Sequence, residues 1–200
     1  HRKKKRFDAA IEDLTRAIKI RPRWALAYND RAYIYRNQNK MKSALADYNH
    51  AIQFKSNFWK AFHDRGQLYL DLGRAEQAIE DFNRALQLNP KHTSSYLLRA
   101  DALLQKRDFP AAVSDYSRVL SQYPKHSVAL HNRGLAYQNS KKFDAALQDF
   151  SKAIEVNPND PQHYFSRGLT YQQMGDTQAA TADYNRTLQI DPKYPEAYAN

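Results

Sequence analysis

Residues 164–171 decide the fold, and they read Tyr164-Phe165-Ser166-Arg167-Gly168-Leu169-Thr170-Tyr171. Two tyrosines and the glycine of this stretch lie at positions i, i+4 and i+7, which is the spacing of one face of an α-helix. The same spacing occurs at Phe62, Gly66 and Tyr69. Because glycine has no side chain, a second helix can approach this face closely. We therefore expect a buried helical stripe that is aromatic at both ends and small in the middle.

The stretch belongs to one copy of a repeat of about 34 residues, a length within the range of stacked-repeat proteins. Alanines recur with one constant step at Ala10, Ala44, Ala78, Ala112, Ala146 and Ala180. Large apolar residues do so at Leu14, Tyr48, Phe82, Tyr116, Phe150 and Tyr184, and again at Tyr28, Phe62, Tyr96, Leu130, Tyr164 and Tyr198. Small residues recur at Ala32, Gly66, Ala100, Gly134 and Gly168. A fixed period of this kind indicates stacked supersecondary units.

Each repeat contains two helical stripes with a break between them. Gly73 and Gly175 lie at that break, where a helix must end. Prolines end most repeats, at Pro22, Pro90, Pro124, Pro158 and Pro192. Pro161 and Pro195 fall in the first turn of a following helix, where proline is tolerated. Each repeat is therefore predicted to be a helix, a tight turn, a second helix and a link.

This pattern resembles the tetratricopeptide repeat family over essentially the whole chain. The segment 164–171 has that family's aromatic, glycine and tyrosine positions, and the alanine, aromatic, alanine and proline positions follow. The resemblance implies an all-α fold, a right-handed α-solenoid of stacked helix–turn–helix repeats with about twelve helices. It is specific for the fold and says little about function.

The period divides the chain into one array over residues 1–200. Residues 1–24 hold the second helix of a partial repeat, and residues 195–200 start a further repeat. Five full repeats lie between them, at 25–58, 59–92, 93–126, 127–160 and 161–194. Solenoid ends need polar caps, and neither end shows one. The sequence therefore predicts a fragment of a longer array or of a larger protein.

Composition and charge exclude several classes of protein. No stretch has the ~18 apolar residues of a membrane span, and no apolar segment follows the basic start as in a signal peptide. The absence of cysteine excludes disulfides and thiol catalysis; it fits the cytosol without selecting a compartment. Residues 1–60 carry 15 Lys and Arg against 5 Asp and Glu, whereas residues 61–200 carry 16 of each. A nucleic-acid-binding array would spread its basic charge more evenly, which argues against that function.

Two charged sets repeat in phase beside the packing stripes. They are Arg31, Arg65, Arg99, Arg133 and Arg167, and Asp13, Asp47, Asp81, Asp115, Asp149 and Asp183. Charges at such positions need partners, and the planar guanidinium can bind a carboxylate through two bonds. We predict Arg–Asp bridges and favour pairing within a repeat, as in Arg31 with Asp47, over pairing with the preceding repeat. The alternative is an arginine ladder that captures anions.

The family resemblance implies a concave groove lined by first-helix residues that lie off the packing stripe. The candidate groove residues are Asn29, Asp30, Tyr33, Asn37, His63, Asp64, Gln67, Asp71, Asp101, His131, Asn132, Asn139, Phe165, Leu169 and Gln173. Tyr33 and Phe165 are first-helix aromatics that packing does not explain. The carboxylate clamp of chaperone-binding members is absent. Acidic and amide side chains come first and amide and apolar ones later, which predicts a peptide that is basic at one end with an apolar anchor at the other.

The sequence predicts a non-enzymatic protein-interaction scaffold, without cofactor or metal. No catalytic motif is present, and His63 and His131 lie two repeats apart. One alternative is the substrate-recruiting arm of a larger enzyme. Another is a docking edge for an acidic partner or nucleic acid, formed by basic within-repeat turns at Lys4, Lys5, Arg6, Lys40, Lys42, Arg74, Lys106, Arg107, Lys141 and Lys142. The partner's identity and the oligomeric state are left open.

Overall fold

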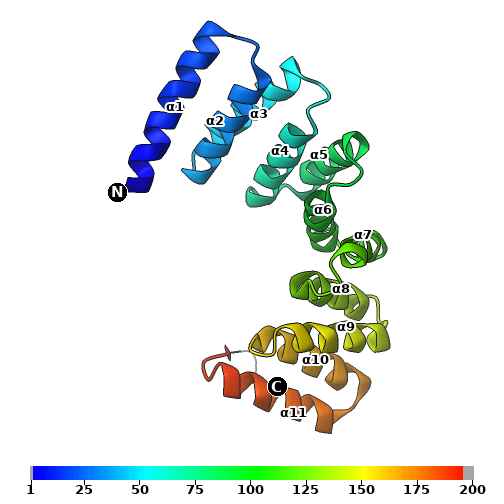
Figure 1. The fold of residues 1–200 in the computed structure, drawn as a ribbon. Coiled ribbons are helices and arrows are strands. Elements are labelled where there is room, and N and C mark those ends of the chain that lie inside the picture. Colours follow the sequence, from blue (N-terminus) through cyan, green and yellow to red (C-terminus); the bar gives the residue numbers. More distant parts are fainter. Residues whose placement is uncertain (1, 196–200) are drawn as a thin grey trace. The chain divides into compact units, whose positions relative to one another are not determined.

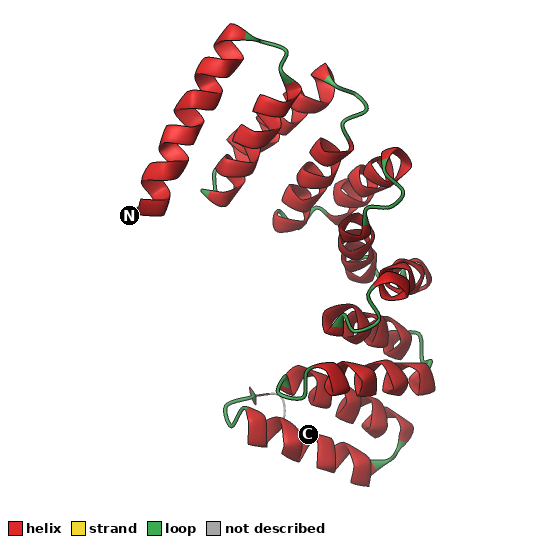
Figure 2. Cartoon of the chain, viewed as in Figure 1, coloured by secondary structure: helices red, strands yellow, loops and turns green. Residues whose placement is uncertain are grey.

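The computed structural model describes the backbone of residues 2–195 and the side chains of residues 6–195, and this part of the chain is helical without any strand (Figure 2). Eleven helices follow one another there: α1 (Arg2–Ile20), α2 (Ala25–Asn37), α3 (Met41–Phe54), α4 (Trp59–Asp71), α5 (Ala75–Leu88), α6 (Thr93–Gln105), α7 (Phe109–Gln122), α8 (Ser127–Asn139), α9 (Phe143–Val156), α10 (Pro161–Met174) and α11 (Thr177–Ile190) (Figure 1). The predicted all-α repeat fold is confirmed. The expected twelfth helix, with Tyr198, falls on residues 196–200, outside the described range.

The helices form hairpins with the period of the sequence. The first helices begin at residues 25, 59, 93, 127 and 161, and the second helices at 41, 75, 109, 143 and 177. The pairs α2 with α3, α4 with α5, α8 with α9, and α10 with α11 pack together most extensively. The chain divides into two compact units, residues 1–102 (unit 1) and residues 103–200 (unit 2).

Within each unit, second helices pack on the first helices that follow them. In unit 1, α1 contacts α2, α3 contacts α4, and the first helices α2 and α4 also touch each other directly. Unit 2 has the same order, with α7 on α8, α9 on α10, and the first helices α8 and α10 in direct contact. First helices of successive repeats therefore share a surface within each unit. These are the helices that carry the candidate groove residues.

The repeated apolar residues form the core as predicted. Ala44, Ala78 and Ala146 are fully buried, together with the large rings of Tyr48 and Phe82. The small positions are needed because those rings lie against them. A Cβ on Gly66 would lie 2.9 Å from the Phe82 ring, a Cβ on Gly134 2.7 Å from Phe150, and a Cβ on Gly168 2.9 Å from Tyr184. A larger residue at these glycines would push the two helices of a hairpin apart.

The turn inside each hairpin has one backbone geometry throughout. Its central residue has a positive φ at the equivalent place of every full repeat: Asn39, Gly73, Arg107, Lys141 and Gly175. The next amide donates back across the turn, as from Lys40 N to Tyr35 O at 2.8 Å. This is the bond pattern of a Schellman helix end, which favours glycine at the left-handed residue. The two turn glycines therefore mark a position that non-glycine residues also occupy.

Candidate functional site

The repeated arginines bind the aspartates of their own repeat. Arg31 Nε and Nη2 donate to Asp47 Oδ2 and Oδ1 at 2.7 and 2.8 Å. Three other arginines make the same two bonds at 2.7–2.8 Å, in the pairs Arg65–Asp81, Arg133–Asp149 and Arg167–Asp183. The aspartates are buried and the hydrogen bonds to Asp149 raise the pKa of Arg133. Pairing within the repeat, the arrangement favoured above, is confirmed.

Each of these arginines also reaches the preceding repeat, which the sequence analysis missed. Arg133 Nη1 donates to Ser117 Oγ at 2.9 Å, so one guanidinium joins α7, α8 and α9. The equivalent acceptors are Thr15 for Arg31, Asn49 for Arg65, Asn83 for Arg99 and Ser151 for Arg167. Their hydroxyl or amide side chains recur once in every repeat and could have been found from the sequence. Because three N–H donors of a guanidinium such as that of Arg133 are engaged inside the chain, a structural role that holds repeats together is favoured over an anion-capturing ladder.

The first-helix surface of unit 1 is tied together by side-chain bonds between α2 and α4. Asn29 Nδ2 donates to Asp64 Oδ2 at 3.0 Å, and Lys60 Nζ lies 3.2 Å from the same oxygen. Further along the same two helices, Arg36 donates to Asp71 at 2.5 Å and to Gln67 Oε1 at 2.9 Å. The carboxylates of Asp64 and Asp71 are therefore already paired with cations of this chain.

Beside these bonds between α2 and α4, Tyr33 is the candidate residue with the large exposed ring. Its side chain is 49% exposed although it lies on a helix between two others. Asn37 is exposed one turn further along α2, and its Nδ2 donates to Tyr33 O at 2.8 Å. Asn29 is fully buried and Asp64 nearly so, which makes them supports and not contact residues. Asp30 and, on α6, Asp101 are half-buried.

His63 takes part in a ring cluster between α4 and the start of α6. His63 Nδ1 and His92 Nδ1 each lie 2.8 Å from Ser95 Oγ, a hydroxyl that can donate to one ring and accept from the other. Trp59 packs on His92 with ring centroids 4.5 Å apart. Burial lowers the pKa of His63 to about 4, so the ring is neutral at pH 7.

The equivalent place in unit 2 holds two buried histidines. His131 Nδ1 and His163 Nδ1 are 3.0 Å apart, which requires one ring to donate and the other to accept. His163 Nε2 lies 3.6 Å from Asp160 Oδ2. Burial lowers the pKa of His131 to about 4 and also lowers that of His163. Sequence analysis missed His163, although its separation from His131 along the chain equals that of Ser95 from His63.

The remaining candidates in unit 2 lie on α8 and α10. Asn132 and Leu169 are half-buried, whereas Asn139 and Gln173 are exposed. Asn139 Nδ2 donates to Leu135 O at 2.8 Å, as Asn37 does to Tyr33. Phe165 is half-buried against Tyr184 and Tyr194, with centroids 5.7 and 5.1 Å apart, so packing explains much of its position. This surface is uncharged at the candidate positions.

Among the described residues, no group of three or more His, Asp or Glu side chains is placed to hold a metal ion. None of the described helices is long and apolar enough to cross a bilayer.

A sequence model of the family described as tetratricopeptide repeat matches residues 1–57 and 63–127, and a second model with the same description matches residues 127–160 and 161–194. No match was found among curated protein sequences.

Solved structures share the fold at low sequence identity. The crystal structure of YrrB, described as a TPR protein with an unusual peptide-binding site, is 21% identical with a TM-score of 0.86, covering 94% of this chain and 97% of that one. MamA from Desulfovibrio magneticus RS-1 is 18% identical with a TM-score of 0.82, covering 86% and 97%. Cut9–Hcn1, an APC/C hetero-tetramer, is 18% identical with a TM-score of 0.73, covering 96% of this chain but 38% of that one. The fold, the repeat period and the family matches together place this chain in the tetratricopeptide repeat family.

Proposed function

We propose that the chain is a non-enzymatic scaffold that binds a segment of another protein on its first-helix surfaces. The observation that carries this proposal is Tyr33, an aromatic ring 49% exposed on a surface whose base is fixed by bonds between α2 and α4. Exposed aromatics on rigid surfaces are enriched among residues that dominate binding energies. The peptide-binding site named in the description of YrrB, which shares the fold, is consistent with this function.

The chemistry of the two surfaces differs, and so do the segments that they suit. In unit 1, Asp30, Tyr33 and Asn37 offer a carboxylate, a ring and an amide, which suits an extended segment with a basic residue. The pairing of Asp64 and Asp71 with Lys60 and Arg36 weakens their attraction for a basic ligand. In unit 2, Leu169 and Phe165 with Asn139 and Gln173 suit an apolar side chain flanked by backbone amides.

The test is a peptide selection followed by titration. Peptides selected from a random library on the immobilised chain are measured by calorimetry against wild-type protein and variants. Tyr33→Ala and Asp30→Lys should each lower the affinity for the selected peptide by about tenfold or more, the loss expected for a hot-spot residue. The control is Lys141→Glu with Lys142→Glu on the within-hairpin turn, which should leave the affinity unchanged. The opposite ranking would move the binding site to the basic turn edge.

A further inference from the structure

One aromatic position of the repeat lacks its ring in the fourth repeat. In the described part of the chain this position holds Tyr28, Phe62, Tyr96 and Tyr164, but Leu130 in the repeat 127–160. The first repeat shows what the ring occupies. Tyr28 packs on His50 and Phe54 with centroids 5.1 and 5.5 Å apart, and its hydroxyl donates to Pro22 O at 3.3 Å. In the fifth repeat, Arg186 lies over the Tyr164 ring, with its Cζ 5.8 Å from the centroid.

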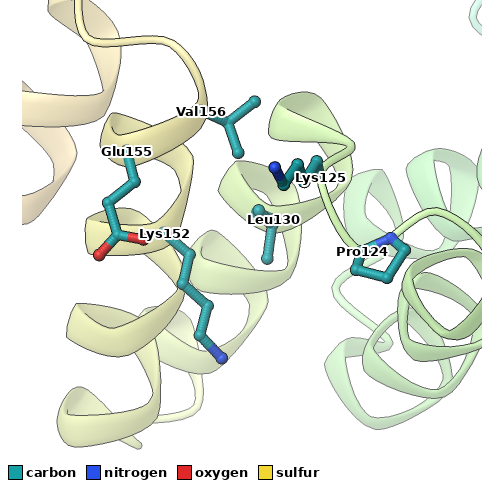
Figure 3. Close-up of a pocket in the computed structure, with 6 residues that line it drawn as sticks. All are labelled: Pro124, Lys125, Leu130, Lys152, Glu155 and Val156. Carbon is teal, nitrogen blue, oxygen red and sulfur yellow. The ribbon is translucent and has the colours of Figure 1, made fainter.

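The fourth repeat lacks that ring and keeps only the proline among the three neighbours named above. The residues equivalent to Pro22, His50 and Phe54 are Pro124, Lys152 and Val156. Leucine and valine are smaller than the tyrosine and phenylalanine that they replace. A cavity of about 490 Å³ lies at this place, lined by Pro124, Lys125, Leu130, Lys152, Glu155 and Val156. Figure 3 shows Leu130 of α8 between the link residues Pro124 and Lys125 and the α9 side chains. Leu130 is only 2% exposed, so it lies at the floor of the cavity, and its neighbours cover almost all of its own surface.

The rim of this cavity is predominantly basic. Lys125 and Lys152 are exposed, neither forms an ion pair with a described residue, and Glu155 is the single acidic side chain of the lining. A second hollow, of about 530 Å³, shares Pro124 and Lys125 and continues along Tyr123, whose side chain is 55% exposed. The two hollows together offer an open cavity floored by Leu130, two ammonium groups and an adjoining apolar strip on unit 2.

We propose that this cavity binds a tyrosine side chain of a partner protein that is flanked by acidic residues. The ring takes the space that Tyr28 fills in its own repeat, and its hydroxyl donates to Pro124 O, the equivalent of Pro22 O. Flanking carboxylates pair with Lys125 and Lys152, where a cation also gains from lying beside an aromatic face. The chain's own occupant of this slot is a tyrosine in three described repeats, which favours a phenol over a nucleic-acid base. The site lies at the link before α8 and the end of α9, apart from the candidate first-helix residues.

The probe is a fluorescein-labelled peptide with one tyrosine between two pairs of glutamates, titrated by fluorescence polarisation. Leu130→Tyr supplies the missing ring from the chain itself and should weaken binding by about tenfold or more. Lys152→Glu, and replacement of the peptide's tyrosine by alanine, should weaken it as much. Lys141→Glu on the turn is the matched charge control and should have little effect. Tyr33→Ala should also leave this peptide unaffected, which separates this site from the first-helix surface.

Two results overturn the proposal. One is equal affinity of the peptide for wild-type protein and for Leu130→Tyr; the other is equal binding of the peptide that lacks tyrosine, which would mean that the lysines act as a general basic surface. Leu130→Tyr restores a residue that neighbouring repeats already hold, so its melting temperature should equal or exceed that of the wild type. If it does not fold, Val156→Phe fills the same cavity with the residue found at Phe54, and the same loss of binding is expected.

Discussion

His63 in unit 1 and His131 in unit 2 hold the same position in their repeats, yet their contacts differ. In both units that position meets the residue 32 places later, on the next first helix. In unit 1 the partner is Ser95, whose hydroxyl serves two rings, whereas in unit 2 it is His163, which shares one proton with His131. The repeat thus fixes which residues meet, and one side chain decides whether the ring meets a hydroxyl or a second histidine. The junctions between repeats can therefore be alike in backbone and different in how deeply they bury titratable rings, because His131 and His163 are buried whereas His63 and His92 are half-buried.

The largest expected effect concerns the Arg–Asp bridges, which the two units have in common. Arg133→Leu leaves Asp149, whose side chain is 4% exposed, without its cation, and should lower the free energy of unfolding by about 3 kcal/mol. Arg65→Leu in unit 1 should cost the same, because its bonds to Asp81 have the same lengths. Urea denaturation followed by circular dichroism measures both losses. The double variant Arg133→Leu with Asp149→Leu should regain most of the loss; a single variant as stable as the wild type would show that the bridges do not stabilise the fold.

The second prediction concerns the buried histidine pair, which unit 2 has and unit 1 lacks. Burial lowers the folded-state pKa of His131 to about 4 from its ordinary 6.5, so the unfolded chain takes up the proton first. The contribution that neutral His131 makes to the free energy of unfolding is therefore fully present above about pH 6.5 and is lost as the pH falls towards 4. His163→Ser gives unit 2 the contact of unit 1 and should reduce the acid-induced loss by about 1–2 kcal/mol, since one buried ring and its repulsion disappear.

The measurement compares urea unfolding at pH 7 and pH 4.5 for each protein. Ser95→His makes the reverse exchange in unit 1 and should increase the loss between the two pH values. His50→Ser, at an exposed ring, is the control for general titration effects. If His163→Ser and the control show the same pH dependence, the buried pair is not the source of acid sensitivity in unit 2.

The smallest expected effect compares two turns. Gly73 in unit 1 and Lys141 in unit 2 both have a left-handed backbone, with φ of 69° and 59°. Left-handed geometry costs a residue with a Cβ about 1–2 kcal/mol, a cost that glycine avoids. Lys141→Gly should therefore raise the free energy of unfolding by about 1 kcal/mol, and Gly73→Ala should lower it by a similar amount. Thermal melts of the two variants give the sign, and equal melting temperatures would mean that the turns carry no such strain.

The fold could be predicted from the sequence because its information is repeated. Ala78, Phe82 and Gly66 each belong to a set that recurs in every repeat, so one residue's packing predicts that of its equivalents. The pairing of Arg31 with Asp47 followed from the same periodicity together with helix geometry. The constant period also showed where each helix should start.

The details of the candidate surface could not be predicted in the same way. Tyr33 and Phe165 look alike in sequence, but the first is exposed and the second packs on Tyr184, because exposure depends on neighbours that vary between repeats. The partners of Asp64 likewise do not recur, since no other repeat holds the equivalents of both Lys60 and Asn29. The cavity at Leu130 could have been anticipated, since a leucine interrupts a series of aromatic residues.

The arginine junctions have a consequence for how such a chain can grow. Every full repeat carries a guanidinium donor towards the repeat before it and a hydroxyl or amide acceptor towards the repeat after it, as Arg133 and Ser151 do in the fourth repeat. A gene segment that encodes one repeat therefore encodes both halves of a joint. When such a segment is duplicated in place, the new copy brings a donor for its predecessor and an acceptor for its successor. The array can lengthen by tandem duplication without any compensating mutation at the junctions between repeats.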